Sequence, residues 1–121
     1  MKDPRKVADE VVRCIRARDL EGLAALFDEV NRRKFGPVTE ANRPQLMKLV
    51  EKKAWKIGNV TKVGELREAP SFAGIGGVVA LLRREVYNVF VVTLKKEGDD
   101  YVFDDINSPP VASYLAMKVI K

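Results

Sequence analysis

Histidine is absent from this 121-residue sequence, and cysteine occurs once, as Cys14. Histidine is the commonest general base of enzymes and the commonest metal ligand of proteins. With a single cysteine as well, a zinc site would have to be built from carboxylates. We therefore expect no metal site and no catalytic centre that depends on histidine.

The sequence also has no long hydrophobic run. A membrane-spanning helix needs roughly 18 apolar residues in succession, and no stretch approaches that length. The start, MKDPRKVADE, lacks the apolar stretch of a secretory signal. A lone cysteine cannot form an intramolecular disulfide, and its neighbours Val11, Val12 and Ile15 favour a core position. These features predict a cytoplasmic protein without membrane contact, or an exported protein whose signal has been trimmed.

A glycine-rich phosphate-binding loop is lacking too. The glycines of APSFAGIGG, residues 69–77, stand before an apolar strand pattern. A nucleotide cradle needs a strand before the glycines and the first turn of a helix after them. The segment is interpreted as a flexible connection, and we expect no cofactor.

Basic residues exceed acidic ones modestly, 22 against 17, which gives a net charge of +5. Charges of both signs are interspersed, and the basic clusters are short: residues 32–34, the group Lys52, Lys53 and Lys56, and residues 95–96. This pattern is typical of a solvated surface. Nucleic acid is not an expected partner, and binding to it would require the clusters to converge on one face.

The stretch from Gly76 to Ile106 organises the chain, because it has the pattern of strands that fold back on one another. β-Branched and aromatic residues in VYNVFVVTL and YVFDDI flank the charged segment KKEGDD, which predicts a β-hairpin. The run from Val78 to Lys96 exceeds an ordinary strand in length, so a turn is expected within residues 83–88.

The register of the hairpin depends on its turn. With a two-residue turn at Glu97 and Gly98, three pairs face each other: Leu94 with Tyr101, Val92 with Phe103, and Phe90 with Asp105. A longer loop changes these partners. In either register both faces of the sheet are largely apolar, unlike a sheet with one face in water. Helices can cover one face, and a partner chain, a ligand cavity or the C-terminal tail must cover the other.

The first half of the chain contains three segments with the apolar spacing of helices. They are residues 4–18 after the capping pair Asp3 and Pro4, residues 20–34 after Asp19, and residues 44–55. Residues 59–68 alternate as an edge strand. We predict one α+β domain over residues 1–121, with three N-terminal helices packed on a curved antiparallel sheet of about four strands and a short C-terminal helix or tail.

The stretches CIRARDLEGLAALF, residues 14–27, and VVTLKKEGDDYVFDDI, residues 91–106, resemble the helical corner and the closing hairpin of the nuclear transport factor 2-like superfamily, an α+β cone or cystatin-like roll. The resemblance implies a pocket between the concave sheet and the helices, and frequent dimerisation through the outer sheet face. Enzymes of that superfamily use an Asp and His pair or an Asp and Tyr set. This sequence matches neither pattern, so the resemblance transfers no catalytic residue and settles no function.

Aromatic side chains are the candidates for contact with a ligand. Tyrosines can donate hydrogen bonds to a bound molecule, and aromatic residues at the ends of elements can line the mouth of a cavity or seal one end of the fold. The pocket candidates are Trp55, Phe72, Tyr87, Phe90, Tyr101 and Phe103.

Asp105 is the single weak candidate for a catalytic role. Asp104 and Asp105 are neighbours on a strand, so their side chains are expected on opposite faces and cannot act as a pair. If Asp105 is buried opposite Phe90, it can serve as a base toward an acidic C–H group. Alternatively it caps a turn before Ser108.

Three functions remain. The first is a non-catalytic domain with a pocket that binds a small apolar or amphipathic molecule or a protein partner, and that forms a homodimer through its sheet. The second is a small-molecule isomerase, dehydratase or cyclase that uses Asp105 with tyrosine donors. The third is nucleic-acid binding through the basic clusters. A two-sided apolar sheet without an assembled catalytic set favours the first.

Overall fold

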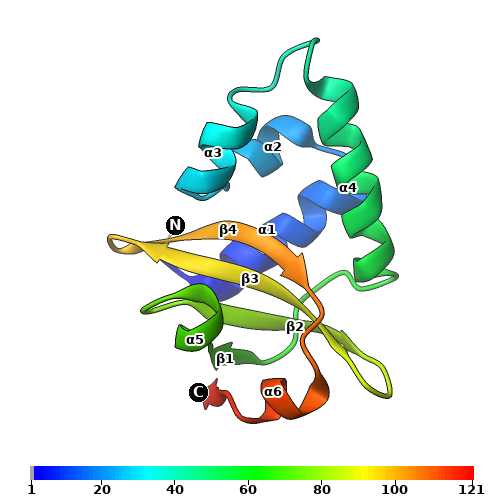
Figure 1. The fold of residues 1–121 in the computed structure, drawn as a ribbon. Helices are drawn as coiled ribbons and strands as arrows, with labels where there is room; N and C mark the ends of the chain where they lie inside the picture. The colour runs from blue at the N-terminus through cyan, green and yellow to red at the C-terminus, as the bar shows by residue number, and fades with distance from the viewer. Residues whose placement is uncertain (1) are drawn as a thin grey trace.

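The computed structural model describes residues 2–121, and its fold is α+β, as predicted (Figure 1). The elements in chain order are α1 (Pro4–Ala17), α2 (Leu20–Ala24), α3 (Glu29–Phe35), α4 (Arg43–Ile57), β1 (Leu66–Glu68), α5 (Pro70–Ala73), β2 (Val78–Arg84), β3 (Val89–Glu97), β4 (Asp100–Asn107), α6 (Val111–Leu115) and β5 (Lys118–Ile120). The helices α2, α3 and α4 stand beyond the β4 edge of the sheet in Figure 1.

The five strands form one antiparallel sheet in the order β4-β3-β2-β1-β5. Residues 85–88 turn the chain between β2 and β3, inside the predicted interval. The tight turn between β3 and β4 lies at Gly98 and Asp99, one residue later than a turn at Glu97 and Gly98. Gly98 has a φ of 63°, a left-handed conformation that glycine adopts without steric strain.

The hairpin register differs from the one expected for the earlier turn. The observed pairs include Leu94 with Phe103, Val92 with Ile106, and Thr93 with Asp105. The register shifts between Thr93 and Leu94, so β4 carries one extra residue, Asp104, as a β-bulge. The bulge places Asp105 opposite Thr93 and corrects its expected position opposite Phe90.

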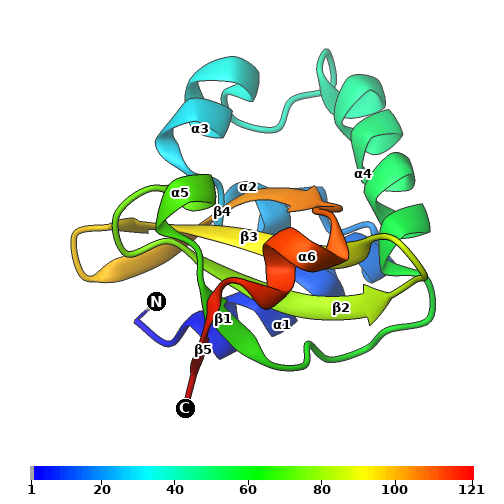
Figure 2. The same ribbon diagram turned by 60° about the horizontal axis from the view of Figure 1, so that its bottom comes forward.

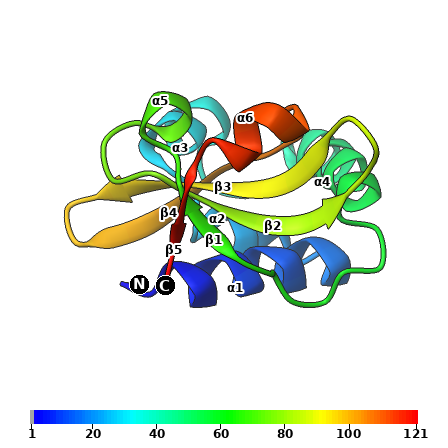
Figure 3. The same cartoon turned by 90° about the horizontal axis from the view of Figure 1, so that it is seen from below.

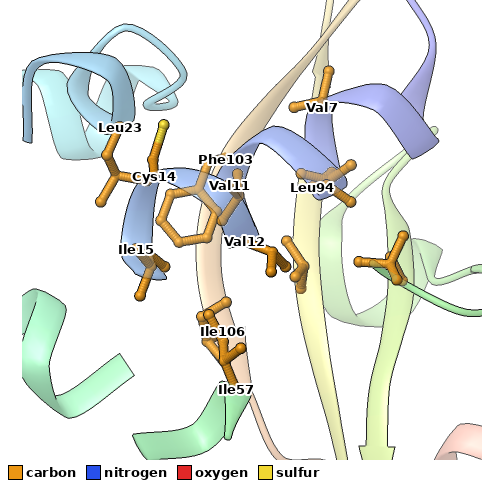
Figure 4. Close-up of a cluster of buried hydrophobic side chains, with 14 of the residues drawn as sticks. Val7, Val11, Val12, Cys14, Ile15, Leu23, Ile57, Leu94, Phe103 and Ile106 are labelled. Atoms are coloured by element: carbon orange, nitrogen blue, oxygen red, sulfur yellow. The ribbon is translucent and has the colours of Figure 1, made fainter. Parts of the chain in front are cut away.

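One face of the sheet packs against α1, which runs along it in Figure 3. Asp3 begins this helix by accepting a hydrogen bond from Arg5 N, and Pro4 is its first residue. The apolar side chains of α1 recur every three or four residues and are buried against Leu94, Phe103 and Ile106, as Figure 4 shows: Val7, Val11, Val12 and Ile15.

The opposite face is covered by α5 and α6 (Figures 2 and 3). Tyr114 of α6 is 3% exposed and packs in a cluster with Val79, Val89 and Val91 of the sheet. Its hydroxyl donates to Glu65 Oε1 at 2.6 Å. Burial raises the pKa of Tyr114 to about 12, so the hydroxyl keeps its proton at neutral pH. The sequence left three possible covers for this face: a partner chain, a ligand cavity or the C-terminal tail. In the structure the C-terminal segment covers it, together with α5.

The helix predicted over residues 20–34 is two helices. Between them, Phe27 forms a bridge with Phe103 of β4. Phe103 N donates to Leu26 O, and Asp28 N donates to Phe103 O at 2.8 Å. These backbone groups pair with the edge of the sheet, so they are not available for helical hydrogen bonds.

The strand predicted over residues 59–68 forms only at Leu66–Glu68, and β5 raises the number of strands from about four to five. The segment 69–77, expected as a flexible connection, contains the short helix α5. Within residues 2–121, no helix is both long enough and apolar enough to cross a membrane.

Candidate functional site

A cleft of about 160 Å³ lies where the N-terminal helices meet β4. Its floor consists of buried apolar side chains from four elements and the turn before α3: Ile15, Leu23, Phe27, Val50 and Phe103. The rings of Phe27 and Phe103 stack with their centroids 6.2 Å apart. Three residues of this floor, Ile15, Leu23 and Phe103, are labelled in Figure 4. The floor is therefore an apolar surface in contact with several elements of the fold.

The rim of the cleft is polar. Asn31 and Lys34 come from α3, Lys53 comes from α4, and Asp104 and Asp105 come from β4. Lys53 Nζ lies 2.7 Å from Asp105 Oδ1, and Asn31 Nδ2 donates to Asp104 O at 2.8 Å. Two lysines and two aspartates leave the rim without net formal charge.

The β-bulge explains why both aspartates reach the rim. In a regular strand, neighbouring side chains point to opposite faces. Asp104 is the extra residue between Phe103 and Asp105, which pair with Leu94 and Thr93, so the regular alternation is interrupted at this point. The two carboxylates have different lysine partners: Asp105 pairs with Lys53, and Asp104 lies 3.3 Å from Lys95 Nζ. They form two separate ion pairs and not a paired acid and base.

Lys95 also approaches Asp28, the residue that caps α3. Its Nζ lies 3.0 Å from Asp28 Oδ2, an ion pair whose geometry falls outside that of a hydrogen bond. Asp28 is 1% exposed, and its other oxygen accepts from Asn31 N at 2.9 Å. Burial raises the pKa of Asp104, and the nearby Lys95 ammonium partly opposes this effect.

We expect the contribution of Asp104 to the free energy of unfolding to increase as the pH falls. Its pKa is higher in the folded protein than in the unfolded chain, so the folded state binds the proton more tightly, and the contribution of Asp104 to the free energy of unfolding rises from neutral pH toward about pH 3.9. Urea unfolding at pH 7 and pH 4 should therefore show wild type gaining stability relative to Asp104→Asn at the lower pH. Asp99→Asn, in the exposed hairpin turn, is the control. A pH-independent difference between wild type and Asp104→Asn would contradict the effect.

Two of the residues singled out from the sequence lie at the cleft. Phe103 is part of its floor, and Asp105 is part of its rim. The Asp105 side chain is 42% exposed, and its Oδ1 also accepts from Ile106 N at 2.8 Å. Asp105 is thus neither buried nor fully solvated.

The other five pocket candidates lie elsewhere. Trp55, at the end of α4, is exposed and meets Phe90 edge-on with their centroids 6.2 Å apart. Tyr87 is exposed between β2 and β3, and Tyr101 contacts a lysine near the hairpin turn. Phe72 lies on α5 at the outer face. The structure does not bring these side chains to one site.

Sequence reasoning missed Asn31, Lys34 and Lys53. Lys53 follows Leu49 and Val50 by one helical turn, and this spacing indicates that the three share a helix face. Asn31 and Lys34 reach the rim because the chain breaks at Phe27 and restarts as α3. The local signal for that restart is Asp28, whose side chain caps α3.

A larger hollow of about 620 Å³ lies between α5 and α6 on the outer face. It is lined largely by exposed or half-buried residues, among them Phe72, Pro110 and Met117. The smaller cleft is the better candidate for a small molecule, because a buried apolar floor there meets several convergent polar groups.

Each of the three basic clusters contains residues engaged by acidic side chains. Arg32 and Arg33 pair with Glu97 and Glu29, and Lys53 pairs with Asp105. Lys95 contacts both Asp28 and Asp104. These charges are therefore partly neutralised within the chain.

The fold and the cleft define a small α+β protein with an apolar site at the junction of its helices and its sheet. Comparison with protein-family models, curated proteins and solved structures found no match.

Proposed function

We propose that this protein is a non-catalytic binding domain of the nuclear transport factor 2-like kind, and that its cleft holds a small amphipathic molecule. The observation that carries this proposal is the apolar floor beneath a polar rim. A cavity of about 150 Å³ lined by aliphatic and aromatic side chains can hold benzene. The cleft has a similar volume, about 160 Å³, so the apolar part of the ligand is about the size of one six-membered ring.

The rim indicates the polar part of the ligand. The rim carries charges of both signs, Lys34 and Lys53 beside Asp104 and Asp105, so a charged ligand would be attracted by two of these side chains and repelled by the other two. A neutral hydroxyl or carbonyl can exchange hydrogen bonds with such a rim without that penalty. The expected ligand is therefore neutral.

Catalysis by Asp105 with tyrosine donors has less support. Asp105 is engaged by Lys53, and none of the three tyrosines lines the cleft. Tyr114, the buried tyrosine, donates to Glu65 on the opposite face of the sheet. An acid or base at the cleft would lack the donors that the enzyme hypothesis requires.

The homodimer was expected because one apolar sheet face needed a cover. In the structure α5 and α6 cover that face, so a second chain is not needed to exclude water from it. A homodimer through the sheet face stays a prediction, and sedimentation equilibrium measures it directly.

Benzyl alcohol is expected to bind in the cleft, and benzoate and benzylamine are expected to bind more weakly because each brings a charge. Leu49→Trp fills the cleft with a larger side chain and should weaken benzyl alcohol binding at least about tenfold, equivalent to about 1.4 kcal/mol. NMR titration gives each dissociation constant. Leu115→Trp, which adds the same side chain on the outer face, is the control and should leave the constant unchanged. If the two substitutions changed the dissociation constant equally, benzyl alcohol would not bind in the cleft.

A further inference from the structure

The helix α3 forms part of the wall of the cleft, but none of its side chains is fully buried. Val30, an apolar residue of this helix, is 63% exposed. Phe35, the last residue, packs partly against the core through Phe27. A helix of 7 residues is too short to be stable alone in water. Polar contacts must therefore fix much of its position.

One carboxylate, that of Glu97 at the end of β3, makes two contacts with α3. Its Oε2 accepts from Glu29 N at 2.9 Å, and its Oε1 lies 3.0 Å from Arg32 NH2. Glu97 does not line the cleft. Both oxygens of one carboxylate thus hold the outer side of α3 to the hairpin.

Further polar contacts attach α3 to the same hairpin. Asp28, at the start of the helix, pairs with Lys95 of β3 at 3.0 Å. Asn31 Nδ2 donates to Asp104 O of β4 at 2.8 Å. Segments held by few apolar contacts and by hydrogen bonds near solvent are the ones that open locally at low free energy.

The two ends of α3 can act as hinges. Before it, Phe27 is fixed to β4 by its bridge with Phe103. After it, Gly36 has a φ of 66°, and the space around the position of a Cβ atom there is open. A short segment hinged at both ends and held largely by polar contacts with one hairpin is suited to move as a unit.

We propose that α3 is a lid on the cleft, and that its release from Glu97 lets a ligand enter and leave; this inference rests on the proposed ligand binding. When α3 moves away, Asn31 and Lys34 leave the rim and the apolar floor becomes accessible. When it returns, the same residues complete the rim around the ligand.

The test is Glu97→Ala, which removes both contacts with α3 and leaves the lining of the cleft intact. Loss of one hydrogen bond and one exposed ion pair should speed the opening of α3 by about tenfold. Hydrogen exchange of the amides of residues 31–35 should accelerate by that factor. Association and dissociation of benzyl alcohol should both accelerate, with little change in the dissociation constant, because a lid affects both rates together.

Glu51→Ala is the matched control, because it breaks the exposed pair between Glu51 and Arg18, which joins α4 to the end of α1 and does not involve α3. The lid is contradicted if both variants give the same rates, or if exchange in Glu97→Ala accelerates throughout the protein. The lid is also contradicted if only dissociation of benzyl alcohol accelerates, because the contacts between Glu97 and α3 would then stabilise the bound complex and not the closed helix. If wild type does not bind benzyl alcohol, the proposed function fails. The exchange rates of residues 31–35 then decide by themselves whether α3 opens while the rest of the protein stays folded.

Discussion

Replacing Tyr114 by alanine is expected to lower the free energy of unfolding by about 3 to 5 kcal/mol, the range for removing a large aromatic side chain from a core. The ring is the main contribution of α6 to the outer face of the sheet, where it packs with Val79, Val89 and Val91. The substitution also leaves Glu65 without its hydroxyl donor, and it removes the ring that lies 4.5 Å from the Arg67 guanidinium. Urea unfolding followed by circular dichroism measures the change.

The neighbouring residue provides the control for Tyr114. Leu115 belongs to the same helix but is 51% exposed. Leu115→Ala should therefore change the free energy of unfolding by about 0.5 kcal/mol or less, as surface substitutions usually do. Similar effects of the two substitutions would mean that α6 does not cover the sheet as described.

Leu94→Ala is expected to lower the free energy of unfolding by about 2 to 5 kcal/mol, through lost burial and the cavity left behind. Leu94 is fully buried on the face that packs against α1, where it pairs with Val78 and Phe103 of the neighbouring strands. The same unfolding experiment measures the loss.

Lys96→Ala serves as the control for Leu94, because Lys96 lies two residues further along the same strand and is exposed. Its ammonium lies 5.7 Å from the centre of the Tyr101 ring, a contact worth about 0.5 to 1 kcal/mol at an exposed site. A small loss for Leu94→Ala, comparable to that for Lys96→Ala, would contradict the packing of α1 on this face.

The two-sided apolar sheet was predictable from the sequence because its signal is local. The β-branched and aromatic residues over 89–93, followed by Leu94, leave neither face of the strand predominantly polar in any register. Gly98 and its charged neighbours marked the hairpin turn to within one residue. The need for a second cover followed from the same pattern, but its identity did not, since several segments could have supplied it.

The break between α2 and α3 was not predictable from the spacing of apolar residues. Leu20, Leu23, Ala24 and Phe27 continue a helical stripe through the position where the helix ends. The competing interaction is the pairing of Phe27 with Phe103, which lies far along the chain. Tertiary pairing outweighs helix propensity here, because propensities differ by less than about 1 kcal/mol per residue.

The cleft was only partly predictable for the same reason. Phe103 could be identified as a pocket residue from its aromatic character in the hairpin. The rim depends on the bulge at Asp104 and on the restart of the chain as α3. Both features arise from contacts between distant segments, which a single sequence does not display.

Nuclear Overhauser effects from bound benzyl alcohol test the binding site most directly. Ring protons of the ligand should show contacts with the methyl groups of Ile15, Leu23 and Val50, which lie on the cleft floor. Contacts with Met117 or Leu115 on the outer face, or no contacts at millimolar ligand, would contradict a ligand site between the helices and β4.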